Sequence, residues 1–199
     1  MKWIGLALFI WSMFWGVELL CDKAQLQERI VRLHVVANSD SEEDQTMKLK
    51  VRDAIVAYLN TSLAEFQDID QVKAYLAENL QTLENIARQV LESAGINECV
   101  NVSFEKETFP IRHYDTFSLP SGVYQSLRIR IGQAEGKNWW CVVFPTLCIH
   151  QTEDGFQEVA AGSGFSDGLA STLTHEEGYE VRFFLLDWLG QLENLLSDQ

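Results

Sequence analysis

The chain has 199 residues, 47% of them hydrophobic and 22% charged, and is long enough to bury a core of its own. Its formal net charge is −14, with 29 acidic against 15 basic side chains. This balance excludes nucleic acid as an expected partner, because binding to phosphates relies on clustered Lys and Arg.

The first residues have the character of an export segment. Lys2 is followed by an uncharged run that ends at Val17. At about 15 residues, this run is shorter than the ~20 that span a bilayer and close to the apolar part of a signal peptide. No small-x-small triplet stands between Val17 and Asp22, so cleavage stays open and residues 3–20 could remain as an anchor. Residues 1–21 are therefore predicted to be a signal peptide or a membrane anchor.

The four cysteines indicate a disulfide rather than a metal site. Cys21, Cys99, Cys141 and Cys148 do not have the paired C-x-x-C spacing of zinc ligands. Disulfides persist in exported proteins. We predict a bridge between Cys141 and Cys148, with a bridge through Cys99 as the alternative.

A strand and a long helix are expected near the start of the folded part. Alternating apolar residues from Ile30 to Val36 predict a strand with one buried face. Residues 38–41 (Asn-Ser-Asp-Ser) supply several candidate N-caps, and acidic residues follow where a helix dipole favours them. Apolar residues at spacings of three and four then predict a helix; they are Met47, Val51, Ala54, Ile55, Tyr58 and Leu59.

A second helix is predicted over residues 69–94. Its apolar stripe runs without a break from Ile69 to Ala94, and Gly95 stands at the usual C-terminal stop. Because the stripe covers fewer than about four heptads and has a capped end, it favours a helix packed on a core over a coiled coil.

Three further strands are predicted over residues 100–105, 123–131 and 138–144, with Pro145 ending the last. The loop 132–137 makes the second and third a predicted hairpin.

In that hairpin Ile129 lies opposite Trp140 and Arg130 opposite Trp139. Trp140 is then expected on the apolar face. Trp139 is expected on the other face, beside Arg128 and Arg130, as a residue for partner binding.

The last part of the chain contains a predicted loop, strand and helix. Residues 152–178 are rich in Gly, Ser, Thr and acids, which is typical of a long loop or insertion. Alternation from Tyr179 to Leu185 predicts a strand, and leucines at helical spacing follow it. The element order predicts an α+β fold: one two-layer domain over residues 22–199, with an antiparallel-rich sheet and helices mainly on one face.

No set of catalytic residues stands out, and we predict no cofactor or metal. Residues 164–168 match the G-x-S-x-G elbow around Ser166, but no buried strand precedes them and no acid lies between Ser166 and His175. Cys148 lies in an apolar run without a cation to lower its pKa. The four histidines show no two-ligand spacing.

Two blocks of the sequence resemble the stage II sporulation protein R family, over about residues 30–150. The first is RLHVVANSDS at 32–41, continuing to 54, which resembles R-x-H-V-x-A-N-S-D-S followed by D-Q-x-x-K-x-x-x-R-D. The second includes LPSGVY at 119–124, RIRIG at 128–132 and GKNWWCVVFPTLC at 136–148. The last of these is long and rare, so the resemblance is specific.

The resemblance implies an exported, non-enzymatic signal of endospore formation. Such a protein leaves the forespore for the intermembrane space, where a membrane-bound aspartic protease requires it to process pro-sigma-E. That protease is the implied partner. Two alternatives are a secreted hydrolase with Cys148 or Ser166 as nucleophile, and a passive envelope component.

The first block supplies further candidates for partner binding. We expect Asn38, Asp40, Arg52 and Asp53 to include both structural and recognition roles. The competing interpretation is that Asn38 and Asp40 only cap a helix and that Arg52 only pairs with a carboxylate.

Overall fold

The structure is a computed structural model that describes residues 2–66, 68–114, 117–145, 165, 169, 172–173 and 180–197. Its contacts divide the chain into two compact units. Unit 1 comprises Met1–Glu28, Thr108–Val123 and Thr152–Gln199, and unit 2 comprises Arg29–Glu107 and Tyr124–Gln151. The predicted single domain over 22–199 stays a prediction.

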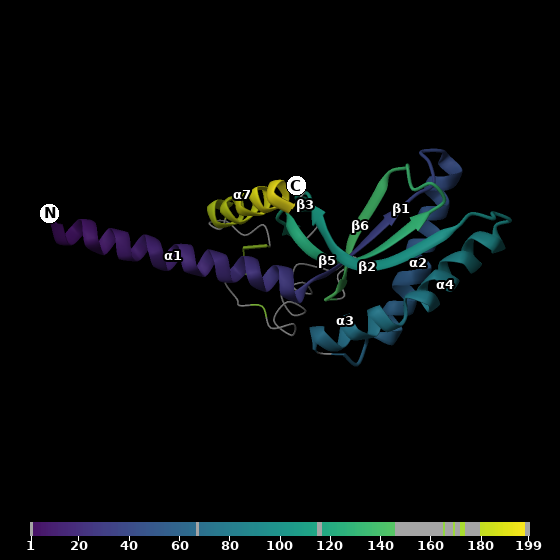
Figure 1. Cartoon of the computed structure of the whole chain (residues 1–199), viewed down its shortest axis with the longest axis horizontal. Helices are drawn as coiled ribbons and strands as arrows, with labels where there is room; N and C mark the ends of the chain where they lie inside the picture. Colours follow the sequence, from purple (N-terminus) through teal and green to yellow (C-terminus); the bar gives the residue numbers. More distant parts are fainter. Residues whose placement is uncertain are drawn as a thin grey trace. The chain divides into compact units, whose positions relative to one another are not determined.

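Unit 2 is built on a four-stranded mixed sheet with the strand order β2-β5-β1-β6 (Figure 1). The strands are β1 (Val31–Val36), β2 (Val100–Phe109), β5 (Gly122–Ile131) and β6 (Asn138–Phe144). β1 pairs with β5 in parallel and with β6 antiparallel. Every residue of β1 is buried, as expected of a central strand, whereas the sequence predicted only one buried face.

Three helices cover one face of this sheet: α2 (Glu42–Ser62), α3 (Ile69–Glu78) and α4 (Leu80–Ser93) (Figure 1). Their buried residues form one hydrophobic core with β1, β2, β5 and β6. α2 begins where the sequence predicted, because the Ser41 side chain accepts a hydrogen bond from the Asp44 N–H as its N-cap. The predicted α+β fold is confirmed.

The predicted helix over 69–94 is broken at Asn79. Asn79 leaves helical geometry at φ −108° and ψ 15°, and its side-chain nitrogen donates to the Tyr75 carbonyl at 2.8 Å. Its own carbonyl accepts the first bond of α4, from the Leu83 N–H. An asparagine side chain competes for backbone hydrogen bonds in this way, which interrupts the helix without interrupting the apolar stripe.

The predicted hairpin of β5 and β6 is wrong, because β1 lies between them. The loop 132–137 crosses the end of β1, where the Glu135 and Gly136 N–H groups donate to the Asn38 and Ala37 carbonyls at 3.1 and 3.0 Å. Strands lie about 4.8 Å apart, so a loop of this length can step over one strand as easily as it can turn back. The predicted orientation of the two tryptophans depended on this hairpin and is therefore wrong as well.

Unit 1 contains α1 (Lys2–Arg29), the short antiparallel pair β3 (Arg112–His113) and β4 (Ser118–Leu119), and α7 (Glu180–Ser197). The strand predicted up to Leu185 is wrong from residue 180 onward, where α7 has already begun. Val181, Phe183 and Leu185 alternate, yet the same apolar run also fits a helix, and a short run cannot distinguish the two. Most of the predicted loop 152–178 lies outside the described residues.

Within the part of the chain that the structure describes, no helix combines the length and apolar character needed to cross a membrane.

Candidate recognition surface

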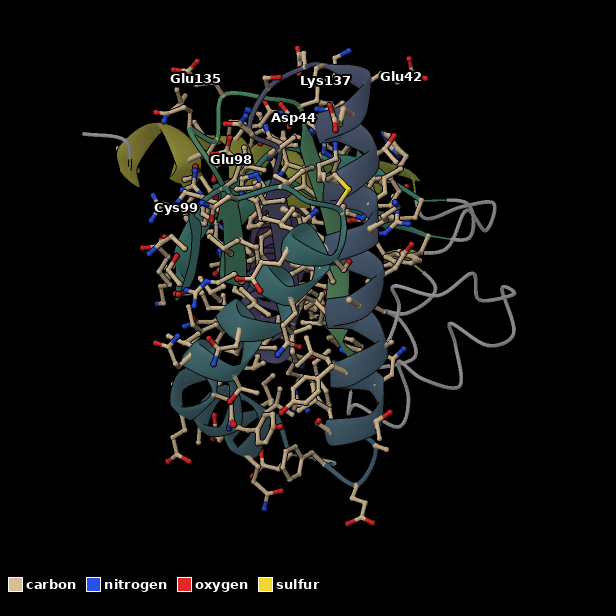
Figure 2. The ribbon with its side chains drawn as sticks, turned by 90° about the vertical axis from the view of Figure 1, so that its right-hand side faces the viewer. Glu42, Asp44, Glu98, Cys99, Glu135 and Lys137 are labelled. Carbon is tan, nitrogen blue, oxygen red and sulfur yellow. The ribbon has the colours of Figure 1, made fainter. Side chains whose placement is uncertain are left out.

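The residues after β1 hold the β5–β6 loop in place. Asn38 Oδ1 accepts a hydrogen bond from the Gln133 N–H at 2.9 Å, and Asp40 Oδ1 accepts one from the Lys137 N–H at 2.7 Å. Figure 2 shows Asp44, Lys137 and Glu135 at this end of unit 2. Two loops distant in sequence are thereby fixed against each other.

Asp44 organises the same junction from the first turn of α2. Its Oδ2 accepts hydrogen bonds from Ser39 Oγ at 2.5 Å and from Asn38 Nδ2 at 3.2 Å. The hydrogen bond from Ser39 is the main reason that the pKa of Asp44 lies below its ordinary value; bonds from Ser41 and Asn38 add to it against a smaller effect of burial.

Glycines allow the two loops to approach closely. A Cβ at Gly136 would lie 2.2 Å from the Ser39 carbonyl oxygen, and one at Gly132 would lie 2.2 Å from Asn38 Oδ1. Gly132 also has φ +56°, which favours glycine. Both glycines fall within the blocks that carry the family resemblance, and the contact explains why a glycine is needed there.

Lys48 completes this junction from α2. It is buried, and its Nζ donates to Gln45 Oε1 at 2.6 Å and to the Lys137 carbonyl at 3.0 Å. Gln45 in turn donates to the Ser39 carbonyl at 2.9 Å. Burial lowers the pKa of the Lys48 ammonium, against the charge of Asp40, which raises it. Lys48 is not among the candidate residues predicted from the sequence, although it occupies the lysine of the D-Q-x-x-K pattern.

One helical turn further along α2, Arg52 covers an exposed tryptophan. The Arg52 guanidinium carbon lies 4.2 Å from the centre of the Trp139 ring, and its Nη2 lies 2.6 Å from Asp53 Oδ1. Trp139 is 37% exposed. Trp139 is the register partner of core residue Val35, so it faces the helices rather than Arg128 and Arg130.

Trp140 lies on the opposite face of the sheet, within a polar layer. Its ring stacks on His34 with centroids 5.5 Å apart. His34 Nδ1 lies 2.7 Å from Glu107 Oε1, and its Nε2 lies 2.9 Å from Asn138 Oδ1. Burial acts to raise the pKa of Glu107, but bonding to His34 and the nearby positive charges outweigh it, so the pKa is lowered.

The predicted partner-binding residues therefore separate into three places on unit 2. Asn38 and Asp40 hold the loop junction, and Arg52 and Asp53 lie with Trp139. Arg128 and Arg130 are elsewhere: Arg128 Nη1 is 3.5 Å from Glu107 Oε1, and Arg130 Nη2 donates to Asn101 Oδ1 at 2.6 Å. The arginines that the sequence analysis placed beside Trp139 do not contact it there; Arg52 does.

The remaining candidates fall partly outside the described residues. Cys21 and Cys99 are free thiols, whereas Cys141 is not a free thiol. Cys148 and Ser166 are not described, so the Cys141–Cys148 bridge stays a prediction. Among the described residues, no group of His, Cys, Asp and Glu is placed to hold a metal ion.

The described residues form an α+β protein in which the start of α2 binds two loops together, and an exposed Arg–Trp pair lies one helical turn further along. The stage II sporulation protein R family model matches residues 27–154. The chain is 30% identical over 186 residues to stage II sporulation protein R of Bacillus subtilis (strain 168), covering 84% of this chain and 83% of that protein. The chain belongs to the stage II sporulation protein R family. No solved structure matches it significantly.

Proposed function

We propose that this protein is an exported, non-enzymatic signal of endospore formation, required for a membrane-bound aspartic protease to process pro-sigma-E. Membership of the stage II sporulation protein R family supports this function. The uncharged run before Glu18 supports export from the forespore, through cleavage or as an anchor.

The Arg52–Trp139 pair is the part of unit 2 that fits recognition of the protease best. Trp and Arg are the residues most enriched at binding hot spots, and here each is partly exposed. The cation–π contact holds both side chains in one geometry before binding, which reduces the entropy that binding costs. The exposed Trp139 under Arg52 is the observation that carries this assignment.

Substitution of Trp139 tests the assignment. We expect Trp139→Ala to lower the free energy of unfolding by about 2 kcal/mol, through the lost burial of the covered part of the ring and the lost contact with Arg52, and to leave the chain folded. Processing of pro-sigma-E in sporulating cells, measured by immunoblot, should nevertheless fall at least tenfold. The purified variant should also lose its cross-link to the protease when the wild-type chain forms one.

Trp140→Ala is the matched control. It removes an adjacent tryptophan from the other face of the sheet, where the ring stacks on His34. We expect it to destabilise unit 2 while the folded fraction still triggers processing. A stable Trp139→Ala chain that signals at the wild-type level would exclude this surface, and wild-type protein that never contacts the protease would exclude direct recognition.

A further inference from the structure

The polar layer on the face of the sheet opposite the helices holds a histidine between two oxygen atoms. His34, in the central strand β1, is 5% exposed. Its Nδ1 lies 2.7 Å from Glu107 Oε1, and its Nε2 lies 2.9 Å from Asn138 Oδ1. An ionised carboxylate and an amide oxygen only accept hydrogen bonds, so both ring nitrogens must donate here. A neutral imidazole carries a single N–H, and this arrangement is therefore that of the imidazolium.

The groups that face His34 keep the carboxylate in its accepting form. Glu107, from β2, also lies 3.5 Å from Arg128 Nη1 of β5. Burial raises the pKa of Glu107, but the hydrogen bond from His34, the His34 charge and Arg128 outweigh it and lower the pKa. On its own strand His34 has Arg32 two residues away on the same face, and in β6 the Trp140 ring stacks on it. Glu107 therefore holds the Nδ1 proton, while the two arginines add positive charge on the same face.

The acceptor at the other ring nitrogen can turn over. If His34 loses the proton on Nε2, that nitrogen becomes an acceptor and faces the Asn138 oxygen, so the hydrogen bond between them is lost. Rotation of the amide by about 180° about its terminal torsion brings Nδ2 to the ring instead, and its N–H restores the bond. Asn138 is exposed, so the amide atom that points away from His34 exchanges at the same time. That atom is the NH2 donor beside the imidazolium and the oxygen acceptor beside the imidazole.

The backbone on either side of Asn138 is held in place, so the response falls on its side chain. The Lys137 N–H donates to Asp40 Oδ1 at 2.7 Å, and the Lys137 carbonyl accepts from Lys48 Nζ at 3.0 Å. On the other side, Trp139 is paired in register with β1. A turn of the Asn138 amide leaves these contacts in place and changes the polarity of one side-chain group.

We propose that His34 and Asn138 form a pH-sensitive switch, in which the Nε2 proton of His34 sets whether Asn138 presents a hydrogen-bond donor or an acceptor to its surroundings. The protonated form presents the donor, and the deprotonated form presents the acceptor. The switch goes beyond the proposed function, because it makes the hydrogen-bonding character of the first residue of β6 depend on the pH around the protein. A partner that bonds to Asn138 is thereby selected by pH.

NMR spectroscopy of the isotope-labelled full chain tests the switch, with the His34 ring signals assigned through bonds from its backbone. At the acid end of the range in which the chain is folded, both ring nitrogens should carry a proton. As the pH rises, Nε2 alone should lose its proton, and Nδ1 should keep the one directed at Glu107. The side-chain NH2 signals of Asn138 should shift with the same midpoint as the ring, because one N–H moves from solvent to the imidazole.

Asn138→Asp is the matched variant, because it keeps the shape of the side chain but, once ionised, can only accept. It should move the His34 midpoint to higher pH by about one unit or more, since the added negative charge favours the imidazolium. Three results would overturn the proposal: an Nε2 that carries no proton at any pH at which the chain is folded, Asn138 signals that do not change at the His34 midpoint, or a midpoint that Asn138→Asp does not raise. All of these measurements use the isolated chain, so they hold whether or not it contacts the protease.

Discussion

Asp44 shows how one carboxylate connects a helix to two loops. It lies in the first turn of α2, where the helix dipole favours an anion, and it accepts hydrogen bonds from Ser39 and Asn38. Asn38 uses its other amide atom to hold Gln133. Asn38 is therefore not the N-cap of α2, which is Ser41; its structural role is to connect the first turn of α2 to the β5–β6 loop.

Replacement of Asp44 by Asn should destabilise unit 2 by about 1–2 kcal/mol at neutral pH, because charged hydrogen bonds are lost. The folded-state pKa lies below the ordinary value of 3.8. This contribution is therefore complete above that value and is lost as the pH falls through the lower folded-state pKa. Urea unfolding from pH 7 to pH 2 should show the difference between the two proteins shrinking to near zero in acid. A stability difference between the wild type and Asp44→Asn that does not depend on pH would contradict the role of the ionised Asp44 carboxylate.

The α2 helix explains why the first family block continues so far along the chain. Gln45, Lys48 and Arg52 follow one another at spacings of three and four, so they share one edge of the helix. The first two bind the loop junction, and the third covers Trp139. One helix edge thus contacts residues from both blocks of the resemblance.

Local elements were predictable to the extent that local chemistry determines them. An N-cap within residues 38–41 and the apolar stripe of α2 depend on nearby residues, and both are confirmed, with Ser41 as the cap among the four candidates. The insertion of β1 between β5 and β6 depends on long-range pairing, which the loop length does not encode. The pairing of Arg52 with Trp139 was missed for the same reason, although each residue had been named as a candidate.

The loop junction can be tested by substitution at two neighbouring positions. Gly136→Ala should destabilise unit 2 by about 2–3 kcal/mol, because its Cβ would meet the Ser39 backbone and neither loop can move independently. Ala134→Gly is the control, since Ala134 has φ +56° and glycine relieves strain there. Its thermal unfolding should be unchanged or up to ~1 kcal/mol more stable. Equal tolerance of both changes would show that the junction is not tightly packed.

At the scale of the whole molecule, the two units are interleaved along the chain. Unit 1 takes its residues from both ends of the chain and from the 108–123 segment, while unit 2 takes the two stretches between them. No single cut separates the units, so neither corresponds to a continuous piece of sequence. The prediction of one domain over 22–199 stays a prediction, since sequence patterns identify boundaries only where a linker joins continuous domains.

The boundary of the export segment gives a prediction for the whole chain. Among residues 16–29 of α1, Val17 and Leu20 are 57% exposed, whereas Asp22 and Leu26 are 4% and 1% exposed, so within this range regular burial begins just after residue 21. Lys23 also pairs with Glu193 of α7 at 3.0 Å. Removal of residues 1–21 should therefore leave the melting temperature of the folded part nearly unchanged. Leu26→Ala in the shortened chain should lower its free energy of unfolding by ~2–5 kcal/mol, as core truncations do. Calorimetry of the full chain, the shortened chain and the shortened Leu26→Ala variant measures both effects. If removal of 1–21 destabilises the chain as much as Leu26→Ala does, the segment belongs to the fold and is not a separate export signal.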